Sequence, residues 1–216
     1  MRYKYVLFDM DGTVLDTLTD LTNAVNYSLE QFSLPVRSRQ EIRSFLGDGA
    51  RQLIERSVPA DCDKELTEQV LTFYNDWYGG HCLIETAPYP GTVELMEKLR
   101  NEGCKLAIVS NKPHGAVTDL ADSFFPGLLE TAVGESETVR RKPCPDAVLA
   151  AMELMGADKE HSLYVGDSEP DILTARNAGI DCASVTWGFR DREQLVSFGA
   201  ELLVDSMEEL YDVIKG

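Results

Sequence analysis

The spacing of hydrophobic residues changes along the chain and divides it into three stretches. The first stretch begins with a short apolar run at residues 3–8, and residues 17–32 then carry apolar side chains every three or four positions. Short apolar runs are typical of buried strands, whereas the wider spacing is typical of an amphipathic helix. The sequence therefore predicts a strand at 3–8 and a helix at 17–32.

The second stretch, from residue 33 to about residue 84, is more polar and contains no apolar run of the strand type. Its amphipathic segments predict helices at 41–46, 49–58 and 64–78. Pro88, Pro90 and Gly91 follow, and these residue types interrupt regular structure. We therefore expect an all-helical block that ends before them.

The third stretch alternates apolar runs with helical patterns. The predicted strands lie at 105–110, 131–133, 162–166, 181–187 and 201–204, and the predicted helices at 92–101, 114–123, 145–155, 170–178, 191–198 and 206–214. This alternation is typical of a parallel sheet covered by helices on both faces, and the strand at 3–8 must join that sheet. We predict an α/β fold with a Rossmann-like three-layer core at 1–15 and 83–216 and an inserted helical domain at 16–82.

The composition of the 216 residues narrows the class of protein. No apolar run approaches the roughly 20 residues that a membrane helix needs, and the first residues lack a signal-peptide pattern. We expect a cytoplasmic protein with no membrane partner. The five cysteines are scattered without a CxxC pair and the three histidines lack ligand spacing, which disfavours a zinc site.

The net charge is −17, from 37 acidic and 20 basic residues, and no basic stripe interrupts it. Phosphate repulsion would oppose binding to DNA or RNA, so we expect no nucleic-acid partner. An anionic small molecule would have to be held by a few focused cations. The sequence leaves both a monomer and a homodimer open.

Polar residues follow several predicted strands at the point where each ends. These residues, together with one lysine in a loop, are Asp9, Asp11, Gly12, Ser110, Asn111, Lys142, Asp167 and Asp171. Ligands of open parallel sheets bind beyond the carboxyl ends of the strands, so these side chains are expected to converge. Their expected convergence at one edge is stronger evidence for a binding site than any one of these short segments alone.

Each motif also has a structural interpretation. An Asp-x-Asp-Gly sequence often forms only a turn, Ser110 can cap a helix, and Lys142 can be a solvated loop residue. A calcium-binding loop is excluded at Asp9, because the glycine occupies the fourth position instead of the sixth and no glutamate occupies the twelfth.

Taken together, four segments resemble the motifs of the haloacid dehalogenase superfamily of phosphotransferases. They are FDMDGT at 8–13, IVSN at 108–111, Lys142, and VGDSEPD at 165–171. The resemblance spans nearly the whole chain and implies that the helical insertion is a cap domain. It implies a magnesium-dependent hydrolase that acts on a small-molecule phosphate ester.

The roles expected of these residues follow from the chemistry of phosphoryl transfer and from the resemblance. Asp9 is the expected nucleophile and Asp11 the expected general acid and base. The resemblance implies that Mg²⁺ is held by Asp9, the backbone carbonyl of Asp11 and Asp167, with Asp171 steadying the metal. The phosphoryl oxygens are expected to bind the residues Ser110, Lys142, Gly12 and Asn111, the last two through nearby backbone N–H groups.

Further segments resemble phosphoglycolate phosphatases: SNKP at 110–113, FLGDGARQLIERS at 45–57 and the tail that begins TWGFRDREQL at 186. The resemblance implies that Gly47, Gly49 and Arg51 contact the leaving group, although a plain helix–helix turn explains the two glycines equally well. The sequence KPCPD departs from the family pattern, which has histidine between the prolines. A pyrophosphatase, a nucleotidase, a sugar-phosphate phosphatase or mutase, and, more distantly, a non-catalytic metal- or phospho-ligand-binding protein therefore stay open.

Overall fold

The computed structural model describes residues 1–216, which form two compact units. Residues Met1–Leu15 and Pro88–Gly216 form the first, here called the core unit. Residues Asp16–Ala87 form the second, here called the helical unit. The chain thus leaves the core unit after its first strand and returns to it some seventy residues later, as an inserted domain requires.

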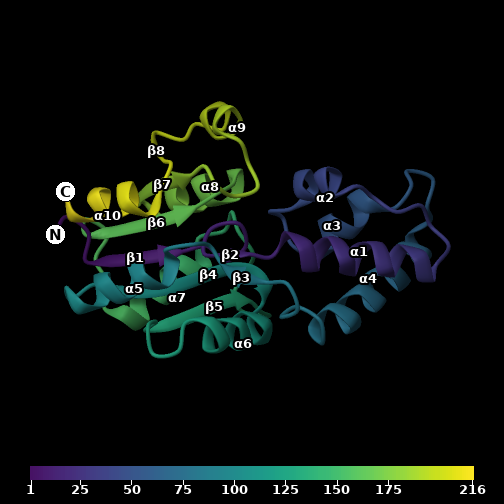
Figure 1. Ribbon diagram of the computed structural model, residues 1–216, viewed down its shortest axis with the longest axis horizontal. Helices are drawn as coiled ribbons and strands as arrows, with labels where there is room; N and C mark the ends of the chain where they lie inside the picture. The colour runs from purple at the N-terminus through teal and green to yellow at the C-terminus, as the bar shows by residue number, and fades with distance from the viewer. The chain divides into compact units, whose positions relative to one another are not determined.

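The core unit is built on a six-stranded parallel sheet with the strand order β5-β4-β1-β6-β7-β8. Its strands are β1 (Tyr5–Phe8), β4 (Lys105–Pro113), β5 (Thr131–Glu135), β6 (Ser162–Gly166), β7 (Asp181–Val185) and β8 (Leu202–Val204). The chain adds β4 and β5 on one side of β1 and then β6, β7 and β8 on the other (Figure 1). The direction of winding reverses beside β1, which is where such sheets bind ligands.

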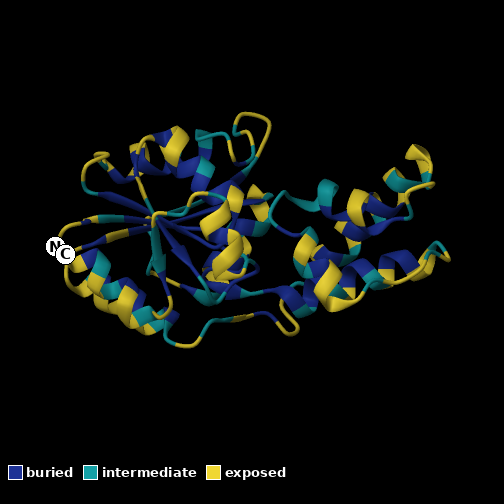
Figure 2. Cartoon of the chain, turned by 90° about the horizontal axis from the view of Figure 1, so that it is seen from above, coloured by how far each residue is buried: buried dark blue, intermediate teal, exposed yellow.

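Helices lie on both sides of this sheet, and its central strands β1 and β6 are almost entirely buried (Figure 2). They are α5 (Thr92–Asn101), α6 (His114–Phe124), α7 (Asp146–Met155), α8 (Glu169–Ala178), α9 (Arg192–Ser197) and α10 (Met207–Lys215). A core cluster joins Leu7, Val109 and Tyr164 of three adjacent strands to Val148 and Met152 of α7. The structure confirms the predicted α/β class, with its parallel sheet and its helical insertion.

The helical unit contains α1 (Leu18–Gln31), α2 (Arg39–Phe45), α3 (Ala50–Ser57) and α4 (Lys64–Gly79). A capping box starts α2, in which Ser38 and Glu41 each accept a hydrogen bond from the other's backbone N–H. Aromatic side chains join α1 to α4, with the ring of Tyr27 5.1 Å from that of Trp77 and 5.8 Å from that of Phe73. The side chains that the two helices bury are others, among them Leu21 and Val25 of α1 and Val70 and Tyr74 of α4.

Two short strands were not foreseen from the sequence. The strands β2 (Leu15–Asp16) and β3 (Ala87–Pro88) pair with each other in a separate two-stranded sheet. Two residues are too few to show an alternating pattern, so no sequence signal predicted them. The strand β4 also continues to Pro113, three residues beyond its predicted end at Ser110.

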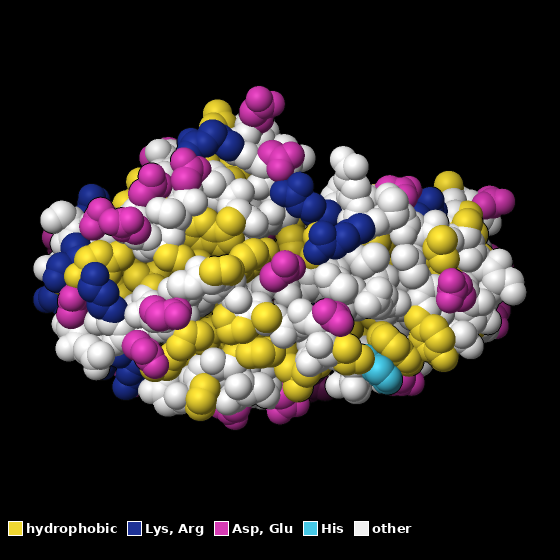
Figure 3. Space-filling model, in the orientation of Figure 1, with side chains coloured by type: hydrophobic (Ala, Val, Ile, Leu, Met, Phe, Trp, Pro, Cys, Tyr) yellow, Lys and Arg dark blue, Asp and Glu magenta, His cyan; other side chains and the backbone are white.

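Acidic side chains are scattered over the face shown in Figure 3, in keeping with the net charge of −17. No helix of the structure is both long enough and apolar enough to cross a lipid bilayer.

Asp20 of α1 binds the last segment of the helical unit, residues 84–86, through its carboxylate. Its carboxylate is buried and accepts hydrogen bonds from the backbone N–H groups of Ile84 (3.1 Å), Glu85 (3.0 Å) and Thr86 (2.9 Å), and from the hydroxyl of Thr86 (2.8 Å). It also lies in the first turn of α1, where a negative charge is favourable.

Asp20→Asn should therefore lower the free energy of unfolding by about 2 kcal/mol, because the new amide group turns a donor towards these donors. Urea unfolding followed by tryptophan fluorescence, to which Trp77 of the same unit contributes, measures this loss. Asp76→Asn, an exposed position of α4, is the matched control. Equal stability of the two variants would contradict the prediction.

Candidate active site

Asp9, the expected nucleophile, lies directly beyond the end of β1. Its side chain is buried, and its backbone N–H donates to the carbonyl of Val165 on the neighbouring strand at 2.8 Å. The chain then turns sharply through Gly12, which has φ of 82°. A Cβ atom on Gly12 would lie 2.3 Å from Oδ2 of Asp167, so the turn requires glycine both for its conformation and for space.

Lys142 reaches the same edge from the loop before α7. Its ammonium lies 2.7 Å from Oδ1 of Asp9 and 2.6 Å from Oδ1 of Asp171, and 3.3 Å from the hydroxyl of Tyr164. The lysine is only 4% exposed, so these contacts form in a low-dielectric environment. The structure thus brings Lys142 and Asp9, which lie far apart in the sequence, into direct contact.

The buried charges shift one another's pKa values. Burial alone would lower the pKa of Lys142, but the charges of Asp171 and Asp9 hold it well above its ordinary value. Burial and the charge of Asp171 raise the pKa of Asp9 well above its ordinary range, and Lys142 opposes this shift. Burial, followed by the charge of Asp171, raises the pKa of Asp167 to about 7. The single positive charge of Lys142 therefore does not balance the negative charges of the three buried carboxylates.

Asp171 is fully buried, and both of its oxygens already accept hydrogen bonds. Oδ1 accepts from Lys142 and from the hydroxyl of Tyr164 at 3.1 Å. Oδ2 accepts from the backbone N–H groups of Asp167 (3.2 Å) and Ser168 (3.1 Å) and from the hydroxyl of Ser168 (2.5 Å). Through these hydrogen bonds, Asp171 fixes the position of Lys142 and of the residues that begin α8.

The end of β4 supplies a third group of side chains. Ser110 and Asn111 are buried, and the amide of Asn111 accepts from the backbone N–H of Lys142 at 2.6 Å through its oxygen. Asn111 therefore fixes the loop that carries the lysine. The next residue, Lys112, places its ammonium 3.2 Å from Oδ1 of Asp11.

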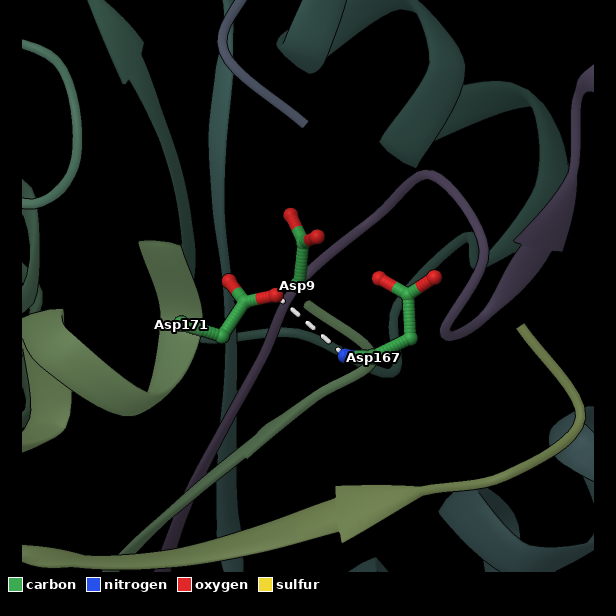
Figure 4. A group of neighbouring side chains, drawn as sticks. All are labelled: Asp9, Asp167 and Asp171. Carbon is green, nitrogen blue, oxygen red and sulfur yellow. Dashed lines mark hydrogen bonds between the residues drawn. The ribbon is translucent and has the colours of Figure 1, made fainter. Parts of the chain in front are cut away.

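Three of the carboxylates form a cluster that suits a divalent cation. Oxygens of Asp9, Asp167 and Asp171 all lie within 4.8 Å of one another. Figure 4 shows the carboxylates of Asp9 and Asp167 pointing to the same side, with Asp171 beside them. Oxygen-only ligands are those that Mg²⁺ prefers, and a cation here would offset the negative charge that Lys142 leaves unbalanced. The residues present therefore fit the metal that the sequence led us to expect.

The segment TWGF at 186–189, which the sequence singled out only for its resemblance to phosphoglycolate phosphatases, completes this edge through contacts that the sequence did not predict. The backbone N–H of Phe189 donates to Oδ2 of Asp167 at 2.5 Å, and the indole of Trp187 donates to the carbonyl of Thr13 at 3.0 Å. Main-chain donors leave no signature in a sequence. Tyr164 did leave a signal, because a phenol in a fully buried strand needs a polar partner.

The three residues expected to contact the leaving group lie in the helical unit. Gly47 (φ 116°) and Gly49 (φ 85°) form the turn before α3. Arg51 forms a bidentate ion pair with Glu68 of α4 and lies 3.8 Å from Glu55. These contacts give Arg51 a role in joining α3 to α4, and its contact with a substrate stays a prediction.

Comparisons with known proteins agree with this arrangement. A family model described as haloacid dehalogenase-like hydrolase matches residues 6–185. Phosphoglycolate phosphatase 1 of Pseudomonas aeruginosa is 33% identical over 214 residues, which cover 96% of this chain and 78% of that protein. The N-acetylmuramic acid 6-phosphate phosphatase of the same species is 31% identical over 216 residues, covering 99% of this chain and 96% of that protein.

A solved structure from Lactobacillus delbrueckii subsp. bulgaricus is 38% identical to this chain. It superimposes with a TM-score of 0.93 and covers 99% of both chains. The family model spans most of the sequence, including the segments that contain Asp9, Lys142 and Asp167. The chain therefore belongs to the haloacid dehalogenase-like hydrolase family.

Proposed function

We propose that this protein is a magnesium-dependent phosphomonoester hydrolase that acts through an aspartyl-phosphate intermediate on a small phosphorylated metabolite, with phosphoglycolate as the preferred substrate. The observation that carries the proposal is the buried cluster in which the ammonium of Lys142 lies 2.7 Å from Asp9, with Asp167 and Asp171 beside it. A nucleophile, a fixed cation and ligands for a metal thus share one edge of the sheet.

In the first half of the reaction, the carboxylate of Asp9 attacks phosphorus and the bond from phosphorus to the ester oxygen breaks. Asp11 donates its proton to that leaving oxygen. In the second half, Asp11 takes a proton from water, which attacks the aspartyl-phosphate and releases inorganic phosphate. General acid–base catalysis of this kind contributes about 10²- to 10⁴-fold in rate.

A phosphate monoester is dianionic and is repelled by a carboxylate nucleophile. When bound, Mg²⁺ supplies the charge that offsets this repulsion, and Asp9, the backbone carbonyl of Asp11 and Asp167 would hold it. Lys142 contributes a second, fixed positive charge. Ser110 and the backbone N–H groups near Gly12 and Asn111 hold the phosphoryl oxygens, a task that favours buried, preorganised donors.

The choice of phosphoglycolate is supported by the name of the Pseudomonas aeruginosa relative and by the sequence segments that resemble this group. The second relative is named for a phosphorylated sugar, so a sugar-phosphate phosphatase is the second candidate. A pyrophosphatase, a nucleotidase and a sugar-phosphate mutase are less favoured, because neither of these two relatives is named for such an activity. A cytoplasmic location, and a monomeric or homodimeric state, accompany the proposal as expectations.

Residues 16–82 act as the cap in this proposal, and Gly47, Gly49 and Arg51 contribute to the selection of the leaving group. The support for this part is the resemblance of the segment at 45–57 to phosphoglycolate phosphatases. A cap that excludes water favours transfer of the phosphoryl group to Asp9 before water can attack it.

The test is phosphate release by the purified protein with Mg²⁺ from p-nitrophenyl phosphate, phosphoglycolate, pyrophosphate, nucleoside monophosphates and hexose phosphates. We expect release that disappears when EDTA removes the metal and returns when Mg²⁺ is added, with the highest kcat/KM for phosphoglycolate. A folded protein that releases phosphate from none of these compounds would be a non-catalytic binding protein, and the proposal would be wrong.

A further inference from the structure

Lys112 has no role in the reaction described above, yet it lies beside the proposed general acid. Its ammonium is 3.2 Å from Oδ1 of Asp11, and the two side chains are only 10% and 19% exposed. Lysine side chains ordinarily place their charge in water, so a sheltered ammonium at a site edge needs an explanation.

The fold fixes this lysine firmly. Lys112 belongs to β4, and its backbone N–H donates to the hydroxyl of Ser110 at 3.3 Å. The preceding residue, Asn111, is anchored to the backbone of Lys142. The backbone that carries this lysine therefore belongs to a strand of the sheet, and the printed contact of its ammonium is with Asp11.

The position of Asp11 determines what Lys112 can reach. A general acid must come within about 3 Å of the oxygen that it protonates. Because the ammonium lies 3.2 Å from Oδ1 of Asp11, it lies within about 6 Å of the ester oxygen of a bound substrate. A carboxylate on the carbon that bears that oxygen is near enough to pair with the ammonium.

Lys142 cannot serve this purpose, because its ammonium already contacts the carboxylates of Asp9 and Asp171. The large negative charge of the protein also opposes any second anionic group on a substrate. The ammonium of Lys112 beside Asp11 would reduce this repulsion locally, next to the leaving oxygen.

We propose that Lys112 is a specificity-determining residue that binds the carboxylate of a substrate whose carboxylate and phosphate ester are carried by the same carbon atom. This inference rests on the proposed function and identifies the residue that would distinguish phosphoglycolate from uncharged esters of the same size. It assigns no role to Lys112 in the bond-breaking step.

The test compares phosphoglycolate with 2-hydroxyethyl phosphate, which has an uncharged hydroxymethyl group in place of the carboxylate. Lys112→Met should lower kcat/KM for phosphoglycolate by about 10- to 100-fold, mostly through a higher KM, because a charged hydrogen bond is lost. The kcat/KM of the same variant for 2-hydroxyethyl phosphate should change less than about threefold. This substrate has no carboxylate, so it has no contact with Lys112 to lose. Lys4→Met, at an exposed position, is the matched control and should leave both values unchanged.

Each other outcome is decisive. Equal losses on both esters would mean that Lys112 acts on the phosphoryl group or through Asp11, and would overturn the inference. A wild-type protein that hydrolyses both esters equally well would also overturn it, while the proposed phosphatase function would stand. Hydrolysis of neither ester, with phosphate release from another compound of the panel above, would reject phosphoglycolate as the substrate and overturn the inference, while the phosphatase function would stand.

A second measurement uses the wild-type protein and does not depend on the folding of a variant. Glycolate should inhibit the hydrolysis of p-nitrophenyl phosphate, whereas ethylene glycol at the same concentration should not. Equal effects of the two compounds would contradict a carboxylate contact. In a folded Lys112→Met protein, inhibition by glycolate should disappear, and inhibition by inorganic phosphate should be retained.

Discussion

Asp9→Asn should abolish turnover while leaving the protein folded. The amide nitrogen and oxygen of asparagine do not form the acyl-phosphate, so kcat should fall by more than about 10⁴-fold. The loss should be the same for p-nitrophenyl phosphate and for phosphoglycolate, because both need the same nucleophile. Phosphate release measures the effect.

The stability of the Asp9→Asn variant is expected to equal or exceed that of the wild-type protein. Burial raises the pKa of Asp9, so its ionised form destabilises the folded state at neutral pH, and a neutral amide removes this penalty. Lys142 keeps its second partner, Asp171, at 2.6 Å. Asp119→Asn, at an exposed position of α6, is the control, and normal turnover in Asp9→Asn would mean that the nucleophile lies elsewhere.

Lys142→Met should impair both activity and stability. Removing one member of a buried charge group usually costs about 3–5 kcal/mol, and here the carboxylates of Asp9 and Asp171 would be left facing each other. The phosphoryl group would also lose its fixed cation, so kcat/KM should fall by about 10²- to 10³-fold. Urea unfolding and steady-state kinetics measure the two effects.

The pH dependence of this loss has a definite sign. The pKa of Lys142 is raised in the folded state, so its charge stabilises the protein fully at every pH below the ordinary lysine value of 10.5. That contribution is lost only as the pH rises through the higher folded value. Lys142 also lowers the pKa values of Asp9 and Asp167, so these carboxylates hold their protons to higher pH in folded Lys142→Met. The stability difference between wild type and Lys142→Met should therefore persist, and increase, as the pH rises from 7 to about 9. Lys159→Met, at an exposed position, is the control, and a difference that vanishes within this range would show that the lysine is not held by the acids.

The sequence predicted the position of Asp9 well, because a fully apolar strand followed by two acids fixes where the carboxyl end of the strand must be. The helical unit and the alternation of the core unit were likewise visible in the spacing of apolar residues. The fold class is therefore largely determined by local patterns.

What the sequence could not reveal are contacts between residues far apart in the chain. The double contact of Lys142 with Asp9 and Asp171 depends on the order of strands in the sheet. The hydrogen bonds between Asp20 and residues 84–86 join positions more than 60 apart in the sequence, and these donors are backbone N–H groups. The roles predicted for Gly47, Gly49 and Arg51 concern a bound substrate, and they stay predictions.

The place of β1 between β4 and β6 has a consequence for the order in which the protein forms during its synthesis. The strand is made first, but its partners, beginning with Lys105–Ile108, emerge about 100 residues later, and Ser162–Val165 later still. Residues 16–87, which form a compact unit of their own, are made in the interval. The apolar segment Tyr5–Phe8 must therefore wait unpaired on the nascent chain, where chaperones that bind short hydrophobic segments would find it.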